Sequence, residues 1–339
     1  MDLGAAGSRG VCVPAVGWAV SSPPSTANLL GLTVYGDRRE TVTLLDREGR
    51  IVALLAGRPN GEDWDSVAAE ADEAMGKAAG ECRFKGEDCD HRRGRFATLA
   101  RGISFGGGRT IPGTISNSRR NERALRALCQ HRAMLRIAGF GSCMLATYAP
   151  RVYANMRKNI DDLLKHHPNL RLNFPNSAYP AASFNFGPAT ECYPHLDAAN
   201  EACNWCHITA LGSFNAKTGG HVVLHDLKLV IEFPSGSSIL IPSALFKHGN
   251  TPIQPGEHRR SFTQYCAGGL LRWVRCGFHT VKEYAKVDAE GKAAYEAEMN
   301  VRVEECVARW ATLEELRQMY GVKAHAAEEL AVGDRVDSE

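Results

Sequence analysis

The sequence predicts an α+β fold in which a β-rich centre lies between two helical regions. Short apolar runs separated by Gly and Pro turns follow one another from residue 179 to 266, and strands of this length and spacing are typical of a sandwich or barrel. The flanking regions have the composition and apolar spacing of helices. A chain of 339 residues can bury a large core, and 44% hydrophobic with 23% charged residues is ordinary for a globular protein.

The expected elements follow from local patterns. Residues 1–28 are rich in Gly, Ala, Ser and Pro and are expected to form a disordered leader. Asp63 or Asp65 is expected to cap the first helix, and the first three strands are expected to extend a sheet. Strands are predicted at 32–35, 42–45, 51–55, 183–186, 205–211, 221–224, 227–233, 238–241 and 261–266, and helices at 62–79, 118–138, 150–167 and 281–320.

A Gly-rich stretch from Phe96 to Ser118 separates the first two helices. Its glycines and Pro112 predict irregular structure over most of its length. The stretch lacks the Walker pattern, so binding of a nucleotide by a P-loop is not expected. A loop of this kind, flanked by arginines, is suited to closing over a polymeric substrate.

Charge is distributed unevenly along the chain. Residues 91–136 contain eleven Arg, no Lys and a single acid, Glu122, whereas residues after 280 contain eight Lys and Arg against fourteen Asp and Glu. An Arg block is an electrostatic footprint for phosphate; the alternative is a solvated face of a helical region. The contacts expected with a nucleic-acid backbone are Arg109, Arg119, Arg120 and Arg123.

The eleven cysteines are odd in number and irregularly spaced, and the N-terminus has neither a basic nor an apolar signal segment. These features predict free thiols in a reducing compartment and a protein that is not secreted. Zinc ligation by Cys82, Cys89 and His91, or by the Cys203-x-x-Cys206 pair, is a weaker alternative to core or free cysteines. No apolar run approaches about 18 residues, so no membrane span is predicted.

The strongest chemical motif is His195-Leu-Asp197. In extended backbone, residues i and i+2 point to the same face, so this imidazole and this carboxylate can share one metal ion. Possible third ligands on later strands are His207, His221, His225, His248 and His258. His248 is favoured because it follows one predicted strand and precedes the strand that begins near Arg259. Two His and one carboxylate leave three positions open on an iron, as in non-haem Fe(II) oxygenases.

The last predicted strand supplies an anion-binding pair. By alternation, Arg259, Ser261, Thr263 and Tyr265 share one face. A guanidinium fork and a hydroxyl are groups that bind a carboxylate beside a metal. Arg260 would point to the opposite face, so Arg259 is the expected anchor.

The order His195-x-Asp197, His248 and Arg259-x-Ser261 resembles the 2-oxoglutarate/Fe(II)-dependent dioxygenases. Within them, His195-Leu-Asp197-Ala-Ala-Asn200 is similar to the HxDxxN motif of the TET/JBP family, and the flanking segments are similar to its fungal, transposon-associated branch. These segments are Phe184-Asn-Phe-Gly-Pro, Lys228-Leu-Val-Ile-Glu-Phe-Pro, Ile241-Pro-Ser, Asn250-Thr-Pro-Ile and Ser261-Phe-Thr-Gln-Tyr. The Cys-rich zinc region of the animal members has no convincing equivalent.

The resemblance covers about residues 136–280 and implies a double-stranded β-helix (jelly-roll) core there. It divides the chain into the leader, an N-terminal extension over 29–135 with a basic helical and loop region, this core, and an acidic helical region over 281–339.

The resemblance also implies a set of residue roles. His195, Asp197 and His248 would bind Fe(II), Arg259 and Ser261 would bind 2-oxoglutarate, and Asn200 and Asn185 would face the substrate base. O2 would be the co-substrate, and the methyl group of a methylated nucleic-acid base would be oxidised.

The expected substrate is double-stranded methylated DNA, with 5-methylcytosine ahead of N6-methyladenine. A monomer in the nucleus, or in both nucleus and cytoplasm, is expected. Two alternatives remain open: a hydroxylase of a protein or small molecule, and an inactive transposon-derived DNA-binding module.

Overall fold

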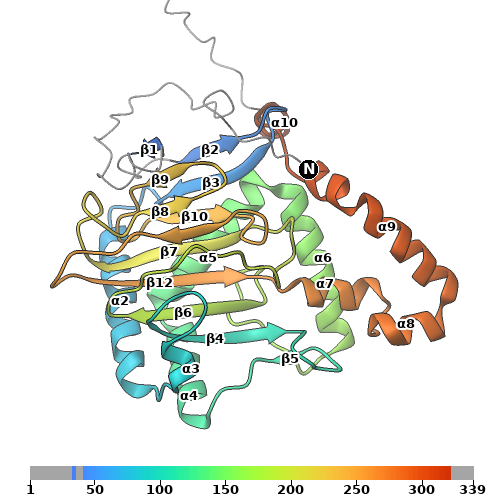
Figure 1. Ribbon diagram of the computed structural model, residues 1–339, viewed down its shortest axis with the longest axis horizontal. Coiled ribbons are helices and arrows are strands. Elements are labelled where there is room, and N and C mark those ends of the chain that lie inside the picture. Colours follow the sequence, from blue (N-terminus) through green and yellow to red (C-terminus); the bar gives the residue numbers. More distant parts are fainter. Residues whose placement is uncertain (1–32, 36–40, 322–339) are drawn as a thin grey trace, which may run out of the picture.

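The computed structural model describes residues 33–35 and 41–321, without the side chains of 33–35 and 298–303. Two sheets face each other and helices flank them (Figure 1), which confirms the predicted α+β class with a double-stranded β-helix core. The large sheet has the order β2-β3-β10-β7-β12-β6-β4-β5, and the small sheet has the order β1-β9-β8-β11. The predicted leader lies outside the described residues.

The strands are β1 (Thr33–Tyr35), β2 (Val42–Leu45), β3 (Ile51–Gly57), β4 (Ala97–Ser104), β5 (Gly113–Thr114), β6 (Ala181–Gly187), β7 (Cys206–Ser213), β8 (Val222–Leu224), β9 (Leu229–Ile231), β10 (Ser238–Ile241), β11 (His248–Asn250) and β12 (His258–Tyr265). The helices are α2 (Trp64–Glu81), α3 (Gly86–Cys89), α4 (Arg119–Gln130), α5 (Arg132–Tyr148), α6 (Pro150–His166), α7 (Gly268–Arg275), α8 (Val281–Val287), α9 (Ala289–Ala308) and α10 (Leu313–Tyr320). The predicted extension therefore adds strands to the same large sheet as the core: β3 pairs with β10, and β4 pairs with β6.

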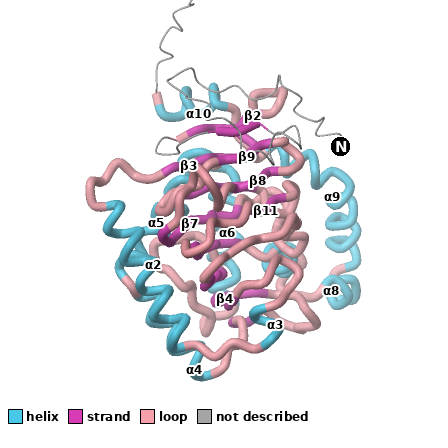
Figure 2. The backbone as a smooth tube through the Cα atoms, turned by 60° about the vertical axis from the view of Figure 1, so that its left-hand side comes forward, coloured by secondary structure: helices cyan, strands magenta, loops and turns pink. Residues whose placement is uncertain are grey.

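The two faces of the large sheet have different partners. Phe184, Phe186 and Phe262 point outward and are buried in one apolar cluster with residues of α2, α4 and α5, such as Val67 and Leu125. Figure 2 shows α2 and α5 on the opposite side of the large sheet from β8, β9 and β11. The inner face, toward the small sheet, is therefore the one on which polar side chains can meet in a cavity.

The expectation of irregular structure over Phe96 to Ser118 is wrong for its first half. Residues 97–104 form β4, which pairs with β6 over 97–102 and with β5 over 103–104. Gly102 does not break this strand. It has φ +121°, and a Cβ there would lie 2.3 Å from the Pro180 carbonyl oxygen, so glycine permits a close approach of the two backbones. The irregular parts are residues 105–112 and 115–118, on either side of β5.

The single basic helix predicted over 118–138 is instead two helices. His131 has φ −67° and ψ 132°, and α5 restarts after it and continues to Tyr148. Apolar periodicity persists across this interruption, so the sequence pattern did not reveal it. At the start of α2, Asp63 occupies the N-cap position without a side-chain capping bond and instead pairs with Arg136.

The prediction of free thiols is wrong for one pair of cysteines. Cys203 and Cys306 form a disulfide that joins the segment after His195-Leu-Asp197 to α9. Their separation of 103 residues gives no local signal of pairing. The other eight cysteines in the described part of the chain are free. None of the described helices is both long and apolar enough to cross a bilayer.

Candidate metal centre

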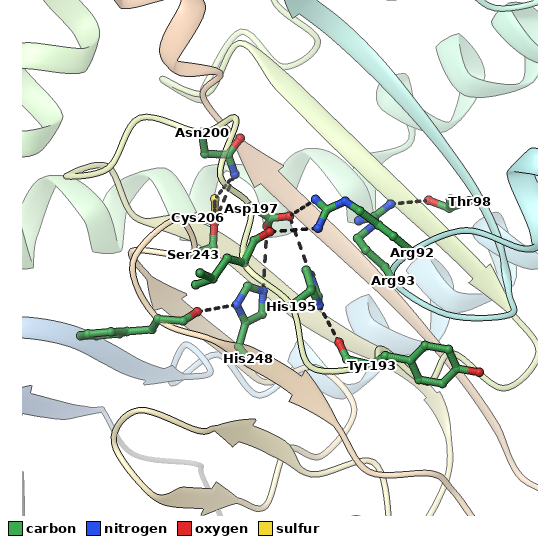
Figure 3. A network of polar contacts seen from close by, with 12 residues as sticks. Arg92, Arg93, Thr98, Tyr193, His195, Asp197, Asn200, Cys206, Ser243 and His248 are labelled. Atoms are coloured by element: carbon green, nitrogen blue, oxygen red, sulfur yellow. Dashed lines mark hydrogen bonds and ion pairs between the residues drawn. The ribbon is translucent and has the colours of Figure 1, made fainter. Parts of the chain in front are cut away.

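The structure brings His195, Asp197 and His248 together (Figure 3). His195 and His248 are backbone partners, with amide-to-carbonyl distances of 2.9 and 3.0 Å. The Asp197 amide donates to the Ser243 carbonyl oxygen over 2.9 Å, which places the carboxylate between the two rings. Within the described ranges this is the one group of three or more His, Cys, Asp or Glu whose ligand atoms lie within 4.8 Å of one another.

Backbone carbonyls orient both imidazoles. The Nδ1 atom of His195 lies 2.7 Å from the Tyr193 carbonyl oxygen, and that of His248 lies 2.8 Å from the Phe246 carbonyl oxygen. Because a carbonyl only accepts, each Nδ1 donates and each Nε2 presents a lone pair to the centre. The Nε2 atoms lie 3.7 and 3.9 Å from the oxygens of Asp197.

Both histidines are held in the neutral form that a metal requires. Burial, followed by the neighbouring His248, lowers the pKa of His195 to about 4. Burial also lowers the pKa of His248, against an opposing effect of Asp197. Two neutral imidazoles and one carboxylate fit Fe(II) with open coordination positions.

Arg259 lies in the same cavity and is almost completely buried, with 2% of its surface exposed. Its Nη1 donates to the Thr190 carbonyl oxygen over 3.2 Å, while its Nε has no hydrogen-bond partner. Among the described residues no carboxylate pairs with it, and burial lowers its pKa to about 10. A buried guanidinium with free donors requires an anionic partner, so this orphaned donor fits the carboxylate of 2-oxoglutarate.

Arg260, the neighbour of Arg259 on β12, points to the opposite face of the strand, as alternation predicts. Arg260 donates to Asp72 of α2 over 2.6 Å and to the Phe186 carbonyl oxygen over 3.0 Å. Arg259, Ser261 and Thr263 all line the metal cavity. The period of two along an extended strand therefore separates the two guanidinium groups correctly.

A chain of hydrogen bonds leads from Arg93, which lines the cavity, to Ser261. Arg93 donates to the Thr98 hydroxyl over 3.3 Å, and Thr98 donates to the side-chain Oδ1 of Asn185 over 2.9 Å. The side-chain Nδ2 of Asn185 then donates to the Ser261 hydroxyl oxygen over 2.8 Å. Asn185 lines the metal cavity but is buried and bonded at both ends of its amide. Because Ser261 accepts this bond, its own hydrogen remains available to an anion at Arg259.

The side chain of Asn200, the other predicted base contact, is held behind the metal motif. Its amide nitrogen donates to the Ser243 hydroxyl over 3.2 Å and to the Cys206 sulfur over 3.3 Å, and its backbone amide donates to the Asp197 carbonyl oxygen over 2.8 Å. The residue is not among those that line the cavity with the metal group. In this conformation Asn200 stabilises the turn that carries Asp197.

The predicted backbone contacts do not gather around the cavity. Arg119, Arg120 and Arg123 are exposed on α4, which packs with α2 on the outer side of the large sheet. Arg109 is exposed in the loop after β4 and donates to the Thr114 carbonyl oxygen over 3.0 Å.

Two other arginines of the same block are the ones at the metal centre. Arg92 donates to the Leu196 carbonyl oxygen over 2.9 Å and lies 3.4 Å from Asp197, and Arg93 lines the cavity. Both belong to the Arg block of residues 91–136, which predicted phosphate contacts and not a place at the metal centre. The only available signal was their position at the start of the block.

The alternative zinc ligands do not assemble. Cys82 is buried and Cys89 is exposed, and the described chain has no metal-ligand group containing either of them or His91. His221 is buried beside Thr251, with Nδ1 2.9 Å from the threonine hydroxyl. His207 is buried on the outer side of the large sheet and bonds Gln264. Neither of these two possible third ligands joins His195 and Asp197, whereas His248 does.

No protein-family model matches the sequence, and no curated protein matches it. Among solved structures, the chain is similar to NgTET1 in complex with 5mC DNA, with 15% identity, a TM-score of 0.49 and coverage of 67% of this chain and 76% of that chain. It is also similar to an oxidoreductase of the 2OG-Fe(II) oxygenase family from Burkholderia pseudomallei, with 17% identity, a TM-score of 0.34 and coverage of 62% of this chain and 94% of that chain.

Proposed function

We propose that the protein is a 2-oxoglutarate- and Fe(II)-dependent dioxygenase. The observation that supports this most is the buried, unpaired Arg259 in one cavity with His195, Asp197 and His248. A metal group alone fits many proteins, and a buried arginine alone is compatible with a structural role. Together they provide a metal with open positions and an anchor for the far carboxylate of an oxo-acid.

We further propose that the substrate is the methyl group of a methylated nucleic-acid base, most of all 5-methylcytosine in DNA, with N6-methyladenine as the second choice. The similarity of His195-Leu-Asp197-Ala-Ala-Asn200 to the HxDxxN motif supports this. The positive charge of Arg92 and Arg93 next to His195 and Asp197 also supports it, because phosphate contacts position a nucleic acid on a protein. We expect a monomer that acts in the nucleus or in both nucleus and cytoplasm.

The bound iron, with O2 and 2-oxoglutarate, would supply the oxidising power, while the chain supplies placement and charge. His195, Asp197 and His248 hold the metal, and the two backbone carbonyls behind the rings keep Nε2 directed at it. Arg259 and the Ser261 hydroxyl orient the co-substrate carboxylate. A base in duplex DNA must leave the stack to reach this cavity, and Arg92 and Arg93 would hold its flanking backbone.

The decisive experiment incubates the protein with Fe(II), 2-oxoglutarate, O2 and duplexes containing 5-methylcytosine or N6-methyladenine, followed by mass spectrometry of the nucleosides. The expected result is an oxidised base and succinate with the wild type and neither with the His195→Ala/Asp197→Ala variant. An oxidised base with that variant would overturn the proposal. Succinate without any oxidised base would favour a protein or small-molecule substrate, and DNA binding without succinate would favour the inactive module.

A further inference from the structure

A second cavity of about 540 Å³ lies between the loop after β4 and the helices that follow β12. Its walls include Phe105 and Arg109 from the loop, Arg272 and Trp273 from α7, and Tyr295 from α9. Figure 1 shows α7 and the β4–β5 region as neighbours at one end of the sheets. This volume falls within the roughly 300–1,000 Å³ typical of small-molecule sites.

Backbone contacts connect this cavity to the metal motif. The Gly268 amide at the start of α7 donates to the Ala199 carbonyl oxygen over 2.9 Å, and Asn200 forms a β-bridge with Ala267. The start of α7 therefore contacts the segment that follows Asp197, and the same helix supplies Arg272 and Trp273 to the second cavity.

The cavity has an excess of positive charge. Arg109 is exposed and its guanidinium donates to one backbone carbonyl, that of Thr114. Arg272 is exposed, and neither arginine forms an ion pair with an acidic side chain of the described residues. Glu296, the acid that lines the cavity, is already paired with Lys292. Two unneutralised guanidinium groups are suited to phosphate oxygens.

Aromatic side chains that contact each other form another wall of the cavity. The rings of Phe105 and Trp273 meet edge to face with their centres 5.1 Å apart, and the Trp273 indole donates to His167 over 3.2 Å. Gly269 permits the contact, because a Cβ there would lie 2.4 Å from the Phe105 carbonyl oxygen. Phe105 stays partly exposed, so a flat ligand ring can pack against it.

We infer that this cavity binds a nucleotide of the nucleic-acid substrate outside the metal cavity, with its phosphates on Arg109 and Arg272 and its base against Phe105. The inference rests on the proposed function. Arginine pairs with phosphate, and aromatic rings stack with bases whatever their sequence, so one nucleotide accounts for both walls of the cavity. Arg119, Arg120 and Arg123 lie on α4, on the outer side of the large sheet. The second cavity is therefore a better candidate than these arginines for contact with a DNA whose target base enters the metal cavity.

The test measures the affinity of a fluorescently labelled DNA duplex containing 5-methylcytosine by anisotropy over a series of salt concentrations. The Arg109→Ala/Arg272→Ala variant should bind at least tenfold more weakly at low salt, and its slope of log affinity against log salt should fall by about 2, since each phosphate contact contributes about 0.9. Phe105→Leu, which keeps the apolar volume, should weaken binding about tenfold without changing this slope.

The matched control is Arg126→Ala/Arg132→Ala, which removes two exposed arginines of the helical layer on the other side of the sheet. It should retain the wild-type affinity and slope, and thermal unfolding of every variant establishes that it is folded. Equal losses in the control and in Arg109→Ala/Arg272→Ala, an unchanged slope in the latter, or no DNA binding by the wild type would overturn the inference. DNA binding that depends on Arg109 and Arg272 without any oxidised base would uphold this cavity while refuting the proposed oxidation.

Discussion

Replacing Arg259 by Met removes a buried positive charge and an anion-binding fork in one change. In the structure its guanidinium donates to one carbonyl oxygen and leaves Nε without a partner, so at least two N–H groups are available to a carboxylate. Two charge-assisted hydrogen bonds contribute about 1.5–3 kcal/mol each. Taking about 3 kcal/mol in total, the variant should bind 2-oxoglutarate about 10²-fold more weakly.

The assay is the unfolding free energy of the Fe(II)-loaded protein without O2, measured with and without 2-oxoglutarate. At a ligand concentration of about 100 Kd the wild type should gain about 2.7 kcal/mol, and the variant at the same concentration should gain about 0.4 kcal/mol. Without 2-oxoglutarate the variant should be as stable as the wild type or more stable, because it no longer buries an unpaired charge.

Arg260→Met is the matched control on the adjacent residue. Its guanidinium pairs with Asp72 on the other face of the strand, so the variant should lose stability and keep the full response to 2-oxoglutarate. A full response in Arg259→Met, or its loss in Arg260→Met, would refute the assignment of the anchor.

Three further predictions concern other parts of the chain. Asn185→Ala frees the Ser261 hydroxyl to rotate, so KM for 2-oxoglutarate should rise about tenfold with a smaller change in kcat. Steady-state kinetics measure both constants, and an unchanged KM would mean that Asn185 does not position Ser261. Burial lowers the pKa of His207 from 6.5 to about 4, so the unfolded chain binds a proton that the native protein excludes, and stability should fall by up to about 3 kcal/mol as pH falls from 6.5 to 4. Urea unfolding should show this loss of stability in the wild type and a smaller loss in His207→Gln. An equal pH dependence of stability in the two proteins would contradict the role given to His207. Cys306→Ser opens a loop of 103 residues and should lower the free energy of unfolding by about 2–4 kcal/mol. Reductant should lower the wild-type Tm to that of the variant. A Tm that changes with neither the substitution nor the reductant would show that the disulfide does not stabilise the protein.

The sequence by itself determined the parts of this protein that depend on spacing along one strand. His195 and Asp197 lie on one face because extended residues two apart do so. The same period places Arg259 and Ser261 in the cavity and sends Arg260 to Asp72. The spacing of the short strands indicated a sandwich or barrel, and the resemblance of the motif order to the 2-oxoglutarate/Fe(II)-dependent dioxygenases implied the double-stranded β-helix core.

Only the tertiary structure decided which distant segments meet. Thr98 reaches Asn185 because β4 pairs with β6 inside a stretch whose glycines predicted a loop. The Arg block divides between the metal centre and the outer helices, and a disulfide joins cysteines 103 residues apart. Local patterns indicate which way a side chain faces on its own helix or strand. The contacts between distant segments depend instead on which elements become neighbours. The free energy that selects those neighbours comes from burying the whole core.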